Sequence, residues 1–96
     1  MTVNIIEKHL PGFKSDAWLV ERDGLHFIVS GVTAFDTGRW EVLVFPSDSS
    51  GKVLNWGDVC GGRGITHSEA INRLDEIPLE TLRENYPTPT PSPDES

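Results

Sequence analysis

The sequence predicts an α+β fold, in which an antiparallel β-meander of about four strands carries one helix on one face. Apolar runs of strand length follow one another with turn residues between them, as in a meander. Helical spacing of apolar residues begins only after residue 66. A chain of 96 residues is long enough for one modest core, so we expect a single domain.

A β-hairpin within residues 17–30 is the clearest element. The Asp23-Gly24 pair separates two apolar runs and is typical of a two-residue type I′ turn. Such a turn sets the register and places Leu19 opposite Ile28 on one face. The other face carries one charged and five apolar residues: Trp18, Val20, Arg22, Leu25, Phe27 and Val29.

Two further strands are expected after a connection at residues 31–39. Residues 40–45 (W-E-V-L-V-F) are apolar on both faces apart from one glutamate, which favours a central or covered strand. Residues 52–56 (K-V-L-N-W) are expected to return beside it. Residues 3–7 fit a short first strand.

The helix is predicted from about residue 67 to residue 77. Thr66 and Glu69 have the T-x-x-E spacing of a capping box, which indicates a helix start. One apolar stripe follows at helical spacing: Ala70, Ile71, Leu74 and Ile77. Pro78 interrupts it, and the apolar spacing within residues 79–86 indicates one further helical turn.

Proline dominates the end of the chain, where every second residue from Pro87 to Pro93 is proline. A segment with few amide hydrogens and little to bury favours an extended, polyproline-like tail. We therefore expect one α+β domain at residues 1–85 and a flexible tail at residues 86–96.

Composition excludes several classes of function. Eight Lys and Arg against fifteen Asp and Glu give a net charge of −7, which argues against sequence-independent nucleic-acid binding. A lone cysteine, Cys60, excludes an internal disulfide and indicates a reducing, cytoplasmic setting. We expect no metal site and no cofactor, because paired ligand spacings are missing. A secretory signal and a membrane span are not visible either.

The main functional candidate is the sheet face that the single helix leaves uncovered. That face carries Leu19 and Ile28 and needs a cover: the N-terminal segment, the 31–39 connection, or another chain. Since an uncovered apolar face usually marks an interface, these two residues are the candidate contacts for a partner protein or a second copy. Trp18, Trp40 and Trp56 are expected in the core or half-buried in the sheet.

The glycine-rich segment at residues 60–67 is the alternative site. Backbone amides at a helix start favour anions, and an arginine adds a bidentate donor. The candidate phosphate or nucleotide ligands are Gly61, Gly62, Arg63, Gly64 and Thr66. The segment matches neither the dinucleotide fingerprint nor the P-loop, and a close-packed connection explains the same glycines. No catalytic residue is assigned, since nothing aims Cys60 and His67 at each other.

The block W-E-V-L-V-F-P-S-D-x-x-G-x-V-x-x-W-G-D-V, followed by the Gly/Arg segment and T-H-S-E-A-I, resembles small accessory proteins of actinobacterial tailed phages. The resemblance covers the central third of the chain and carries no catalytic residue. It implies a protein that acts in the host cytoplasm by binding and inhibiting or redirecting a host protein. A self-associating structural protein is the remaining class.

Overall fold

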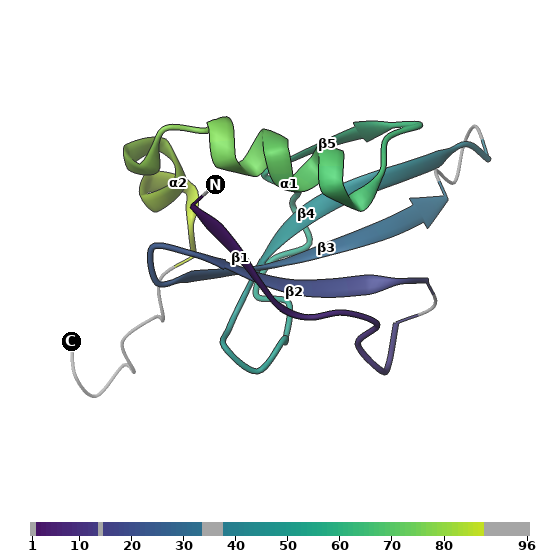
Figure 1. The fold of residues 1–96 in the computed structure, drawn as a ribbon, viewed down its shortest axis with the longest axis horizontal. Helices are drawn as coiled ribbons and strands as arrows, with labels where there is room; N and C mark the ends of the chain where they lie inside the picture. Colours follow the sequence, from purple (N-terminus) through teal and green to yellow (C-terminus); the bar gives the residue numbers. More distant parts are fainter. Residues whose placement is uncertain (1, 14, 34–37, 88–96) are drawn as a thin grey trace.

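The computed structural model describes residues 2–13, 15–33 and 38–87, and it has the α+β fold that the sequence predicts. Five antiparallel strands follow one another in chain order across a single sheet, and two helices pack on one face (Figure 1). The elements are β1 (Val3–Glu7), β2 (Ala17–Arg22), β3 (Leu25–Thr33), β4 (Trp40–Ser47), β5 (Cys60–Arg63), α1 (His67–Glu76) and α2 (Leu79–Asn85). The expected tail beyond residue 87 and part of the 31–39 connection lie outside the described residues.

The β2–β3 hairpin has the predicted register. Leu19 pairs with Ile28, and Val20 pairs with Phe27. Asp23 has a φ of 50° and Gly24 a φ of 85°, which is the double left-handed conformation that a type I′ turn requires. The turn therefore determines which side chains of β2 and β3 share a face.

Replacing Gly24 with valine is expected to destabilise the domain. A φ of 85° is strained for a β-branched residue, while a glycine adopts it at little energetic cost. We expect a loss of about 1–3 kcal/mol in the free energy of unfolding, measured by urea denaturation. Gly24→Asn is the matched control, since asparagine tolerates the left-handed region, and it should lose much less. Equal stability of the valine variant and the wild type would contradict the turn assignment.

The last strand differs from the expectation, because residues 52–56 form no strand. Only Val53 makes an isolated bridge to Ser47, and the strand that pairs with β4 is the glycine-rich β5. A side chain at Gly61 would overlap the backbone of β4, so glycine permits the two strands to pair there. The Gly/Arg segment is thus mainly an edge strand rather than a loop.

The main core lies between the sheet and the helices. Val20, Phe27, Val29, Val42 and Val44 from the sheet meet the buried face of the helices, which is Ala70, Ile71, Leu74 and Leu82. The capping box is confirmed: the Thr66 hydroxyl accepts from the Glu69 amide, and the Glu69 carboxylate accepts from the Thr66 amide. Tyr86, expected in the tail, packs edge-on against Phe27 and donates its hydroxyl to the Ser47 carbonyl.

A second core covers the opposite sheet face. Ala17, Leu19 and Ile28 form a buried cluster with Leu10, Phe13 and Val53 packed against it. Leu19 is 3% exposed and Ile28 is fully buried, so the expectation that they are free to contact a partner is wrong. The cover comes from the chain's own segments, the one before β2 and the one between β4 and β5.

Arg22, the one charged residue on the face of the β2–β3 hairpin that carries Val20 and Phe27, has a structural role. Arg22 is buried, and its Nη1 donates to the carbonyl oxygens of Leu74 at 2.7 Å and Ile77 at 2.5 Å. These carbonyls lie at the C-terminal end of α1, where backbone acceptors carry a partial negative charge, and the Leu74 carbonyl also accepts from the Ile77 amide at 3.4 Å. Arg22 thereby joins β2 to the end of α1.

Candidate functional site

A largely apolar recess lies at the end of β3 and the start of β4. It has a volume of about 480 Å³ and is lined by three aromatic rings among small and hydroxyl residues: Phe13, Ser15, Ser30, Gly31, Val32, Thr33, Trp40 and Trp56. We call it the aromatic recess. Its residues come from three separate parts of the chain, so the fold rather than any local motif assembles it.

The Trp40 indole ring lies over the backbone of β3 at Gly31, where there is no side chain in its way. A Cβ at Gly31 would overlap the Trp40 indole ring, so only glycine permits this position of the ring. The carbonyl of Gly31 accepts a hydrogen bond from the Ser15 hydroxyl. The wall of the recess is therefore closely packed, although Trp40 itself is 46% exposed.

Trp56 is the most exposed large apolar residue in the described part of the chain. Its ring packs edge-on against the buried Phe45, with the ring centroids 5.3 Å apart, yet 68% of the residue is exposed. Leu54 beside it is 43% exposed. The expectation that Trp40 and Trp56 lie in the core or half-buried is wrong for both, while Trp18 is half-buried as expected.

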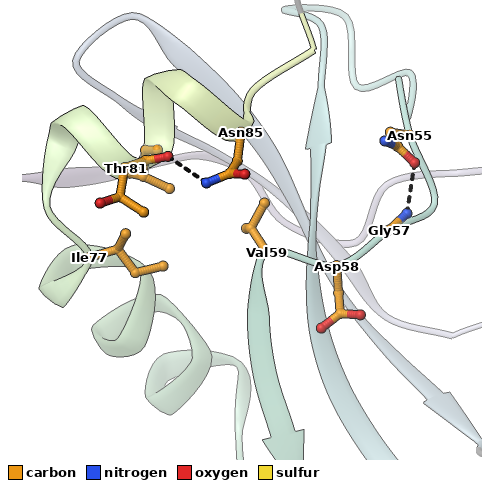
Figure 2. Close-up of a pocket in the computed structure, with 8 residues that line it drawn as sticks. Asn55, Gly57, Asp58, Val59, Ile77, Thr81 and Asn85 are labelled. Carbon is orange, nitrogen blue, oxygen red and sulfur yellow. Dashed lines mark hydrogen bonds between the residues drawn. The ribbon is translucent and has the colours of Figure 1, made fainter.

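A second, more polar cleft separates α2 from the segment that precedes β5 (Figure 2). Its volume is about 560 Å³. Val59, Ile77 and Leu82 provide the apolar part, and the polar groups are Asn55, Asp58, Thr81 and Asn85. Asn85 donates to the Thr81 carbonyl at 2.9 Å, and Asn55 accepts from the Gly57 amide at 2.9 Å. The two amides thus mainly stabilise their own segments, and no group in the cleft is poised for catalysis.

The residues of the anion-binding alternative have other partners. Arg63 forms an ion pair with Glu41 at 3.2 Å, and the Gly61 carbonyl accepts from Arg73 at 2.7 Å. Thr66 is occupied by the capping box, which also brings the Glu69 carboxylate to the helix start. Gly62 pairs within the sheet, while Gly64 donates to the Trp40 carbonyl. The Glu69 carboxylate at the start of α1 repels an anion, so the geometry of residues 60–67 does not support an anion-binding site.

Cys60 and His67 are not brought together as a nucleophile and its base. Burial raises the pKa of Cys60 to about 11, which keeps the thiol protonated at neutral pH. The His67 ring stacks on Trp18, and its Nε2 donates to the Asp16 carbonyl at 2.8 Å. Both residues therefore have structural surroundings.

Asp16 connects several polar side chains near the start of β2. Its carboxylate accepts from Trp18 Nε1 at 2.9 Å and from His9 Nδ1 at 2.5 Å. Burial opposes ionisation of Asp16, but the hydrogen bonds from Trp18 and His9 outweigh it and lower the pKa of the carboxyl. The cluster fixes the segment before β2.

No protein-family model, no curated protein and no solved structure matches the chain. Among residues 2–13, 15–33 and 38–87, no group of three or more histidine, cysteine or acidic side chains is arranged to hold a metal ion. Neither helix in the described ranges is long and apolar enough to cross a bilayer.

Proposed function

We propose that the chain is a protein-binding module and that its contact surface is the aromatic recess. The observation that carries this proposal is the exposure of Trp40 and Trp56 at one recess, 46% and 68% respectively. Tryptophan is enriched at interface hot spots, where a large ring fills a pocket or frames one. Leu19 and Ile28, the original candidates, are replaced by these rings because they are buried.

The composition of the recess supports a macromolecular partner over a small charged ligand. Its lining residues carry no charged side chain, and most of the available area belongs to aromatic and aliphatic groups. A partner that inserts an apolar side chain between the rings of Phe13, Trp40 and Trp56 would remove them from water. Full burial of an exposed aromatic side chain contributes about 1.5–3 kcal/mol, and these rings, which are already partly buried, would each contribute a part of that.

The proposal is tested by comparing variants as bait in affinity capture. We expect Trp56→Ser and Trp40→Ser to lose a partner that the wild-type chain retains, with at least a tenfold drop in recovery. Ile6→Ser is the matched control, since Ile6 is 52% exposed but lies on β1, away from the recess. A partner retained equally by all four chains would place the contact elsewhere.

A more specific form of the proposal names the kind of partner and the compartment in which it is bound. The phage resemblance suggests a host protein as the partner, bound in the cytoplasm and inhibited or redirected there. The acidic net charge and the lone, partly buried cysteine are compatible with that setting. Self-association would use the same rings and would be detected as a dimer by sedimentation.

A further inference from the structure

We infer that the aromatic recess binds the proline-rich segment of the same chain, residues 87–96. This segment reads P-T-P-T-P-S-P-D-E-S. Proline-rich peptides are recognised by grooves lined with aromatic rings, because prolyl rings stack on flat apolar surfaces at low entropic cost. The proposed occupant is thus part of the same chain and is distinct from a partner protein.

Hydrogen-bonding chemistry favours a proline-rich occupant over other apolar peptides. Prolyl residues have a carbonyl acceptor but no amide donor, so at four of its ten positions the segment presents a backbone acceptor alone. The recess offers the matching donors, since the indole N–H groups of Trp40 and Trp56 have no acceptor among the described residues. The carbonyl of Gly31, an acceptor at the wall, is already paired with the Ser15 hydroxyl.

The position of Tyr86 allows the segment to reach the recess. Tyr86 is anchored beside Ser47 and Phe27, and the recess begins three residues further along β3, at Ser30, which is about 10 Å for a strand rise of about 3.4 Å. Ten residues in polyproline geometry span about 31 Å. The excess of about 21 Å allows the chain to pass from the helical side of the sheet to the recess.

The contact goes beyond the proposed function and does not depend on it. If both exist, the segment and a partner compete for the same rings. Effective concentrations within one chain reach the millimolar range for short connections, so even a weak contact is populated.

The experiment records the indole N–H signals of the full chain by ¹H–¹⁵N NMR. A full-length triple variant, Pro89→Ala, Pro91→Ala and Pro93→Ala, keeps the length and charge of the segment. We expect the signals of Trp40 and Trp56 to differ between the wild type and this variant by clearly more than that of Trp18. Trp18 is an internal control, because its N–H is bound to Asp16.

Two further arms identify the occupant. The difference should persist unchanged on tenfold dilution, as an intramolecular contact requires. A synthetic peptide of residues 87–96 should shift the signals of the triple variant toward those of the wild type, and an alanine-for-proline peptide should not. Identical Trp40 and Trp56 signals in wild type and variant would overturn the inference. Loss of the difference on dilution would also overturn it and would assign the contact to a second copy. Affinity capture with the Trp56→Ser variant as bait is a separate measurement. A negative result in one experiment therefore does not contradict the proposal that the other experiment tests.

Discussion

The variant Ile28→Glu is expected to be unfolded at room temperature. Ile28 is fully buried on the face opposite the helices, among Ala17, Leu19 and the side chains that cover them. Burying a carboxylate there without a partner costs several kcal/mol, and the lost apolar packing adds to it. Since domains of this kind are stable by about 5–15 kcal/mol, the substitution removes most or all of the stability. Circular dichroism and urea denaturation measure the effect.

The same substitution at Ile6 is the control. Ile6 is 52% exposed on the edge strand β1, so a glutamate there remains in water and should change the stability by less than about 1 kcal/mol. If Ile28→Glu folded as well as Ile6→Glu, the second core would not exist as described. Leu19 and Ile28 would then again be the best candidates for a partner contact.

The hairpin was predictable because its information is local. Asp23 and Gly24 specify a turn type, the turn specifies the register, and the register assigns each side chain to a face. The capping box at Thr66 is local in the same way, since two residues three positions apart define a helix start. Both predictions were confirmed to the residue.

The edge strand β5 and the cover of the second face were not predictable by the same means. Residues 52–56 have better strand propensity than the glycines of β5, yet only Val53 bridges to β4. Pairing of β5 depends on a close backbone approach at Gly61, which leaves no pattern of apolar side chains. The segments that cover Ile28 have no regular structure. Their apolar residues therefore follow no helix or strand periodicity from which their position could be predicted.

The aromatic recess was missed for a related reason. Trp56 was assigned to a returning strand, where alternation would half-bury it, but it lies in an irregular segment and stays exposed. Trp40 begins the predicted strand as it begins β4, but that strand was expected to be covered on both faces, whereas 46% of Trp40 is exposed. The one available signal is the Asn55-Trp56-Gly57-Asp58 run, where turn-forming residues surround a large ring.

Replacing Arg22 with methionine is expected to destabilise the domain by about 2–3 kcal/mol. The substitution keeps the apolar length of the side chain but removes both donors to the Leu74 and Ile77 carbonyls. Hydrogen bonds from a charged group contribute about 1.5–3 kcal/mol. The Ile77 carbonyl left without this donor carries a further penalty, while the Leu74 carbonyl keeps the Ile77 amide at 3.4 Å. Loss of a positive charge at the C-terminal end of α1 acts in the same direction.

Two matched variants separate these causes in urea denaturation. Arg22→Lys keeps the charge but lacks the planar fork, so we expect it to recover about half of the loss. Arg83→Met removes a basic residue from the last turn of α2, where the side chain is exposed, and should cost less than about 0.5 kcal/mol. If Arg22→Met were as stable as the wild type, water would satisfy the end of α1. Arg22 would then not be the residue that holds the helix layer to β2, and the apolar contacts of Leu74 would have to do so alone.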